Sequence, residues 1–189
     1  MYLFIGLGNP GTEYAKTRHN AGWLALEALR KKFDFEDFAD EKKFFAAVSQ
    51  GKIGKEKIIL ALPGTMMNAS GKAVATLVSF YKVKPDHVVV FQDDSDIVFG
   101  STKLSFARSS AGHRGVESVK RALKTDKFWR VRIGIQPSAK KHVPAMDLVL
   151  RPFKPSEMND LKKIWKRLAE GIEIGLSKEL SMAMNHINS

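Results

Sequence analysis

A histidine and a carboxylate occupy positions from which they could together remove a proton from water. His19 follows a short apolar run at residues 2–7, and Asp93 follows the apolar run VVVFQ. If Asp93 accepts a hydrogen bond from one ring nitrogen of His19, the other nitrogen is free to act as a general base. Alternatively, His19 bonds backbone beside a helix, and Asp93 and Asp96 cap a turn.

Strand-like and helix-like segments alternate along the chain without repeats or a long linker, which indicates an α/β domain. Adjacent strands with no helix between them, at 44–49 and 57–62, indicate a mixed sheet. Open α/β sheets place ligands at the carboxyl ends of strands, so His19 and Asp93 could meet there. The other expected strands are 2–7, 87–92, 102–106, 129–135 and a short one near Leu148. The first expected helix begins after Asn20, which could cap it. Further helices are expected at 70–81, at 114–124 and from Met158 to Gly175, which could end that helix. A last helix could be capped by Ser177.

Length and composition fit one globular domain. The chain has 189 residues, 44% of them hydrophobic, so residues 1–189 are expected to form a single domain. The absence of cysteine excludes disulfides, thiolate zinc sites and a cysteine nucleophile, and it fits a reducing cytoplasm. The N-terminal apolar run lacks a basic leader, and no stretch approaches the ~20 apolar residues that cross a bilayer. We therefore expect a cytoplasmic protein without a membrane partner.

Positive charge is concentrated in one segment. The net charge is +11, and residues 101–142 contain eleven basic and two acidic residues. A local field of this kind favours phosphate-rich ligands, because each neutralised phosphate releases counterions. The segment predicts a nucleic-acid partner; the alternative is a basic surface that serves solubility alone.

Two glycine patterns resemble nucleotide-binding loops. Gly6, Gly8 and Gly11 match the dinucleotide fingerprint, but loop-like residues follow where a helix should begin, and no acidic residue ends a second strand at the required distance. The segment 64–72 has the wrong glycine spacing and no hydroxyl after Lys72 for a phosphate loop. The serine-hydrolase motif G-x-S-x-G and the metal motif H-E-x-x-H are both absent.

Several segments, in order along the whole chain, resemble the bacterial peptidyl-tRNA hydrolase family. They are GLGNPG, a tyrosine and TRHN-G within residues 6–22, MMNASGK, QDDSDI, AGHRG, RIGI, and Ala183-Met184-Asn185. The resemblance implies a central twisted mixed β-sheet packed between α-helices. It also implies hydrolysis, without cofactor or metal, of the ester that joins peptide to tRNA, which recycles tRNA. The implied partners are peptidyl-tRNA, through its acceptor stem and 3′ end, and the nascent peptide, and we expect a monomer.

The resemblance implies roles for individual residues. His19 would be the general base and Asp93 the residue that orients it. The residues implied to bind substrate are Asn9, Tyr14, Met67, Asn68, His113 and Arg114. For each, a structural role is the alternative: turn chemistry for the asparagines, core packing for Met67, a loop anchor for Tyr14 and a helix cap for His113.

For the tRNA phosphates, the resemblance implies Lys103 and Arg132, and Arg108 could reach the same anion. The chain departs from the family pattern at two positions: Ser105 stands where a second lysine is frequent, and Arg114 where asparagine is typical. Some relatives of this fold bind RNA in splicing without catalysis. A non-catalytic RNA-binding protein is therefore the second hypothesis, and a dinucleotide enzyme is the third.

Overall fold

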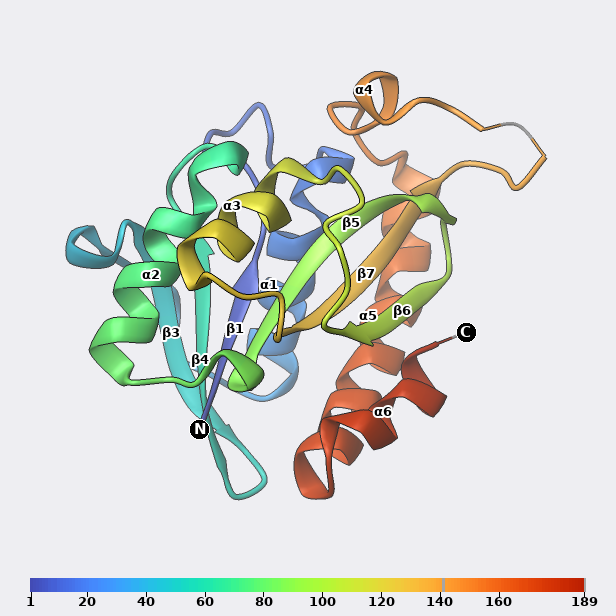
Figure 1. The fold of residues 1–189 in the computed structure, drawn as a ribbon. Coiled ribbons are helices and arrows are strands. Elements are labelled where there is room, and N and C mark those ends of the chain that lie inside the picture. Colours follow the sequence, from blue (N-terminus) through green and yellow to red (C-terminus); the bar gives the residue numbers. More distant parts are fainter. Residues whose placement is uncertain (141, 189) are drawn as a thin grey trace.

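Seven strands form one mixed, twisted sheet in the part of the chain that the structure, a computed structural model, describes: residues 1–140 and 142–188 (Figure 1). The strands are β1 (Tyr2–Gly6), β2 (Ala39–Glu41), β3 (Ala46–Ile53), β4 (Glu56–Pro63), β5 (Val88–Val98), β6 (Thr102–Phe106) and β7 (Trp129–Gln136). Their order is β2-β3-β4-β1-β5-β7-β6. The four central strands, β4, β1, β5 and β7, are parallel to one another. The outer pairs β2–β3, β3–β4 and β6–β7 are antiparallel. The predicted mixed sheet is confirmed.

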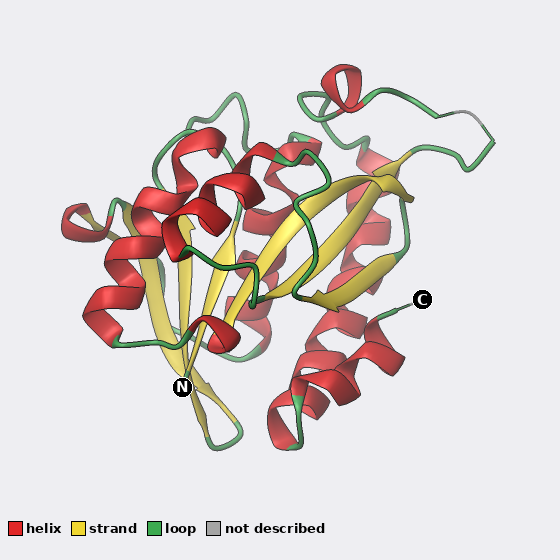
Figure 2. Cartoon of the chain, in the orientation of Figure 1, coloured by secondary structure: helices red, strands yellow, loops and turns green. Residues whose placement is uncertain are grey.

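Helices cover both faces of this sheet (Figure 2). They are α1 (Ala21–Lys32), α2 (Ser70–Tyr81), α3 (Arg114–Leu123), α4 (Ala145–Leu148), α5 (Pro155–Ser177) and α6 (Leu180–Ile187). Side chains of α1, α5 and α6 pack with Phe4, Phe91 and Ile133 on one face. Side chains of α2 and α3 pack with Ile5 and Val90 on the other. Alternate residues of β4, β1 and β5 thus enter opposite cores, which explains their continuous apolar sequence, whereas β7 places Val131 and Ile133 in the core beneath α1 and α5 and carries arginines on its other face.

Three local expectations are corrected. The residues up to Leu148 form the short helix α4 instead of a strand. Residues 149–151 then form a turn, in which the carbonyls of Val149 and Arg151 accept bonds from the segment that carries His19. Gly175 lies inside α5 and does not end it. Glycine at this position lets α6 pack closely against α5, because a side chain there would collide with Ala183 of α6. Ser177 ends α5, and Glu179 occupies the N-cap position of α6.

A close approach of helix and strands fixes where the loop after β1 ends. A side chain at Gly22 would collide with the carbonyl of Phe91 and the backbone of Leu7, so only glycine lets α1 start against β1 and β5. Because β1 and β5 are parallel neighbours, their carboxyl ends lie at the same edge of the sheet. None of the described helices is long and apolar enough to cross a membrane.

Candidate active site

A cavity of about 580 Å³ opens at this edge of the sheet, beside the end of β5. One wall is apolar and includes Met67 and Val149, while the other carries His19, Asp93 and His113. The loops after β1, β4 and β6 and the helix α4 all contribute lining residues. The site lies at the edge of the sheet that the sequence indicated. The strand before Asp93 was expected to end at residue 92, whereas β5 continues to Val98, so Asp93 lies within the strand, beyond its last pairing with β1.

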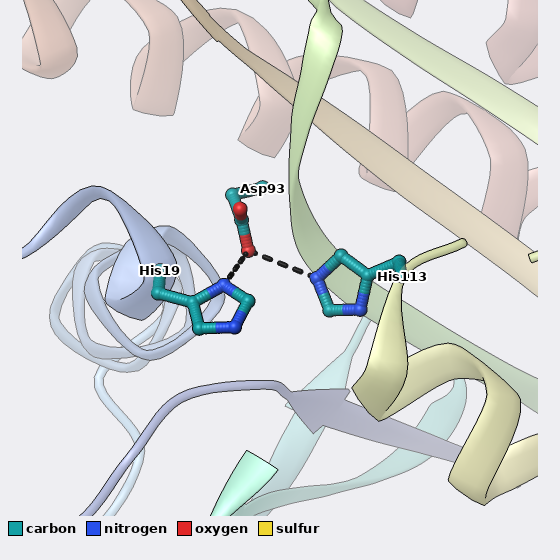
Figure 3. A group of neighbouring side chains, drawn as sticks. All are labelled: His19, Asp93 and His113. Carbon is teal, nitrogen blue, oxygen red and sulfur yellow. Dashed lines mark hydrogen bonds and ion pairs between the residues drawn. The ribbon is translucent and has the colours of Figure 1, made fainter. Parts of the chain in front are cut away.

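His19 lies in a one-turn 3-10 helix, Arg18–Asn20, directly before α1. The N–H groups of Arg18 and His19 donate to the carbonyls of Arg151 and Val149 at 3.0 and 2.8 Å, so the segment after α4 holds this turn in place. Nδ1 of His19 lies 2.8 Å from Oδ1 of Asp93 (Figure 3). The predicted contact between His19 and Asp93 is therefore present.

His113 is a second partner of the same carboxylate oxygen. Its Nε2 lies 2.9 Å from Oδ1 of Asp93 (Figure 3). Its Nδ1 accepts from the backbone N–H groups of Gly115 and Val116 at 3.2 and 3.3 Å, which makes His113 the N-cap of α3. A nitrogen that accepts carries no proton, so Nε2 must be the protonated nitrogen and must donate to Asp93. The cap thus selects one tautomer of His113.

The environment keeps Asp93 ionised. Its side chain is almost fully buried, and burial alone would raise its pKa. Electrostatic attraction and hydrogen bonds from the N–H groups of His113 and His19 outweigh this and hold the pKa of Asp93 below its usual range. An ionised Asp93 accepts, so Nδ1 of His19 carries the proton and Nε2 keeps its lone pair. This second nitrogen points away from Asp93 (Figure 3).

The same three side chains are also of types that bind metals, and their donor atoms lie within 4.8 Å of one another. A metal on Nε2 of His113 would force the proton of a neutral ring onto Nδ1. That proton would break both capping bonds of α3. The donor set thus fits hydrogen-bonded imidazoles better than a metal.

Asn9 is buried and its backbone and side chain are both engaged. Its Oδ1 accepts from the N–H of Met67 at 2.8 Å, and its backbone forms two hydrogen bonds with the side chain of Asn20. Among the described residues, Nδ2 of Asn9 makes no hydrogen bond, and Asn9 lines the cavity. The expectation that Asn20 caps α1 with its side chain is wrong, because that side chain bonds Asn9 instead.

The other predicted substrate residues separate into two groups. Asn68 and Arg114 are exposed and line the cavity, and Met67 is buried and forms its apolar wall against Gly115. Tyr14 lies outside the cavity lining; its backbone closes the turn that leads to Thr17. Its placement matches the loop-anchor alternative.

The three residues predicted to contact phosphate lie on β6, on β7 and in the loop that follows β6. Lys103 and Arg132 are direct partners across the antiparallel pair, so their side chains share a face of the sheet. Nε of Arg132 donates to Oδ2 of Asp94 at 2.7 Å, and Asp94 lines the cavity. Arg108 is exposed in the loop that follows β6. The cations thus lie near the cavity without lining it.

One arginine of the basic segment serves the fold. Arg130 is buried, and its Nη2 donates to the carbonyl of Ser109 at 2.8 Å, which holds the loop after β6 against the sheet. Burial, and after it the charge of Arg132, lowers the pKa of Arg130 to about 10. The segment's charge therefore overstates its capacity for phosphate, and Lys141 of the same segment lies outside the described residues.

Sequence reasoning missed the apolar rim that α4 and the next residues supply. Met146 and Leu150 line the cavity while 85% and 55% exposed. The available signal was the apolar run AMDLVL at residues 145–150, because a contiguous apolar patch that stays exposed often marks a ligand-binding site.

Comparisons with known proteins agree with this arrangement. A profile of the family described as "Peptidyl-tRNA hydrolase" matches residues 3–189. The chain is 37% identical over 190 residues to a peptidyl-tRNA hydrolase of Brevibacillus brevis, with 100% of this chain and 98% of that protein covered. It is 38% identical over 189 residues to the Bacillus cereus (strain Q1) protein of the same name, with both chains fully covered.

Solved structures give the same result. The crystal structure of peptidyl-tRNA hydrolase from Acinetobacter baumannii superimposes with a TM-score of 0.89 at 30% identity, and the match covers 100% of this chain and 95% of that one. The match in sequence and in fold extends over the whole chain, including the segments that carry His19, Asp93 and His113. This chain belongs to the peptidyl-tRNA hydrolase family.

Proposed function

We propose that the chain hydrolyses the ester between peptide and tRNA in peptidyl-tRNA released from ribosomes, with His19 as the general base and Asp93 as the residue that orients it. The observation that carries this proposal is the 2.8 Å contact between Nδ1 of His19 and Asp93, made inside a cavity that His19 lines. It leaves Nε2 available to a water molecule.

The first step transfers one proton. Nε2 of His19 takes a proton from water while the water oxygen attacks the ester carbonyl carbon. Asp93 stabilises the imidazolium that forms, because its carboxylate accepts from Nδ1. Neither side chain of this pair has to rotate before the reaction, since the hydrogen bond between them is already formed.

The negative charge that develops on the carbonyl oxygen requires hydrogen-bond donors. Nδ2 of Asn9 is suited to this role because its partner atom Oδ1 is fixed by the N–H of Met67. The exposed amide of Asn68 can bond the peptide backbone in the same cavity. When the ester C–O bond breaks, the ribose oxygen leaves and takes the proton back from His19.

The tRNA half of the substrate would contact Lys103, Arg108 and Arg132. Lys103 and Arg132 share a face of the sheet, and Arg132 is linked to the cavity through Asp94. We propose that the three cations bind phosphates of the acceptor stem while the 3′ end enters the cavity. His113 supports Asp93 in this proposal and does not itself bind substrate. Tyr14 would act only through the loop that it anchors.

The proposal extends to assembly and location. His19, Asp93 and His113 meet within a single chain, so the proposed chemistry needs no residue from a second copy, and we propose that the protein acts as a monomer. A role in recycling tRNA after translation supports the cytoplasm as its location. The non-catalytic RNA-binding hypothesis is not favoured, because its relatives would have no need of the buried contact between His19 and Asp93.

The test is an assay of N-acetyl-aminoacyl-tRNA, with release of the acetylated amino acid measured over time. Free aminoacyl-tRNA of the same tRNA is the control substrate, because it has the same ester without the peptide bond. We expect fast release from the first and slow release from the second. Binding of tRNA without release from either substrate would instead support the RNA-binding hypothesis.

A further inference from the structure

A second cavity, of about 450 Å³, adjoins the first along α3. Its lining consists of Asn68, Ser110, Gly112, Arg114, Glu117 and Arg121. Four of these residues, Asn68, Ser110, Gly112 and Arg114, also line the first cavity. A ligand held beside His19 can therefore extend past Arg114 into the second cavity.

The second cavity has an excess of positive charge from one helix face. Arg114, Glu117 and Arg121 lie at i, i+3 and i+7 on α3, so their side chains share a face. Two guanidinium groups and one carboxylate line the space, and Asn68 adds an amide. The lining thus favours an anion with several hydrogen-bond acceptors.

These two arginines differ from three others near the site. Arg18 and Arg132 each form an ion pair with a carboxylate, and buried Arg130 donates to a carbonyl. Within the described residues, the side chains of Arg114 and Arg121 make no hydrogen bond or ion pair, even with nearby Glu117. Their donors are available to a ligand.

We propose that the second cavity binds an acidic side chain of the peptide, so that the enzyme prefers substrates with a carboxylate close to the ester. The inference rests on the proposed function, because it needs the ester beside His19. His19 lines only the first cavity and Arg121 only the second, so a side chain that lies between Arg114 and Arg121 belongs to a residue preceding the esterified one. A guanidinium binds a carboxylate through two parallel hydrogen bonds.

The geometry favours the peptide over the tRNA as the source of the anion. The cations proposed for the acceptor stem, Lys103 and Arg132, project from β6 and β7, whereas Arg114 and Arg121 project from α3. Asn68, which carries a peptide-like amide, lines both cavities. The anion thus lies on the peptide's path through the two cavities.

Two matched substrates test this inference: acetyl-glutamyl-lysyl-tRNA and acetyl-glutaminyl-lysyl-tRNA, which differ only in one charge. We expect kcat/KM to be roughly three- to fivefold higher for the glutamyl substrate, the scale of one partly exposed charge pair. Arg114→Gln should bring the ratio to about one. Glu117→Gln should increase the ratio, because it removes a like charge from the same cavity.

Lys166→Gln is the control variant, because it removes one positive charge from an exposed position of α5 outside both cavities and should leave the ratio unchanged. Equal hydrolysis of both substrates by the unmodified enzyme would overturn the inference and leave the proposed function intact. If Arg114→Gln slowed both substrates equally, and did so only with full-length tRNA and not with a nucleoside ester that lacks phosphate, the anion would be a tRNA phosphate and the inference would be wrong. Hydrolysis of neither substrate would overturn the proposed function and the inference with it.

Discussion

Arg18, the residue before His19, donates from its guanidinium to both carboxylate oxygens of Glu157, at 2.8 and 2.7 Å. Arg18 is 4% exposed, its Nη1 lies 3.4 Å from the carbonyl of Ile135, and its guanidinium lies over the ring of Phe153. Glu157 also accepts from the backbone N–H of Lys154 at the start of α5. The turn that carries His19 is thus tied to the first turn of the longest helix.

Breaking this pair should reduce both stability and turnover. We expect Arg18→Ala to lower the free energy of unfolding by about 3 kcal/mol, because it leaves the largely buried carboxylate of Glu157 without its partner. We expect kcat to fall more than KM rises, because His19 loses its fixed position. Urea unfolding and steady-state kinetics measure the two effects. Lys163→Ala removes an exposed ion pair with Asp160 on the same helix and should cost less than about 1 kcal/mol; an equal loss in both variants would contradict the special role of Arg18.

Removing the base should abolish most of the catalysis and little of the binding. We expect His19→Ala to lower kcat by a factor on the order of 10² to 10⁴, with tRNA affinity nearly unchanged. Single-turnover hydrolysis and equilibrium tRNA binding measure the two quantities. His87→Asn is the matched histidine control, since His87 stacks on Tyr2 away from the cavity. A His19→Ala variant with full activity would exclude the mechanism.

Asp93 should link stability to pH in the acid range. Its pKa in the folded protein is below that of an unfolded aspartate, so its contribution is fully present above the unfolded pKa of about 3.9 and is lost as the pH falls further. Asp93→Asn should therefore unfold more easily than the unmodified chain at pH 7, and the difference should shrink below about pH 4. Chemical denaturation across this range measures it. A difference that grew toward low pH would show that the folded-state pKa is raised instead.

Lys103 should contribute to tRNA binding through charge alone, since it is exposed. We expect Lys103→Ala to raise KM for peptidyl-tRNA more than for a short acyl-nucleotide fragment. The slope of log affinity against log salt should flatten by roughly 0.7 to 0.9. Lys166→Gln, on the opposite side of the sheet, should leave the slope as it is. The same slope in both variants would place the tRNA elsewhere.

The contact between His19 and Asp93 could be predicted only in part from the residue pattern. Parallel strands end at the same edge of a sheet, so the loop after β1 and the segment after VVVFQ were expected to come close. The pattern left structural roles open for both residues, and only the family resemblance assigned them as a pair. The roles of Asn9 and Asn68 followed only from the resemblance, because an asparagine beside glycine has the same local pattern in a turn.

Contacts between segments that are far apart in the chain could not be predicted from the sequence. Arg18 and Glu157 are 139 positions apart, and no periodicity links the loop after β1 to the start of α5. Asn20 shows the opposite problem: its local signal as a helix cap is sound, but a buried position next to Asn9 offers its side chain better partners. Arg130 is of a residue type that commonly binds phosphate and belongs to the basic segment 101–142, and only its burial in the structure reveals a different role.

The shared oxygen of Asp93 determines which ring nitrogens of the site carry a proton. Two imidazole N–H groups converge on one acceptor, and the remaining nitrogen of His113 is occupied by the backbone of α3. Of the four ring nitrogens, this leaves the lone pair of Nε2 of His19 for an incoming proton. Substrate thus meets a site whose tautomers are already selected, and no proton has to be redistributed before water attacks the ester.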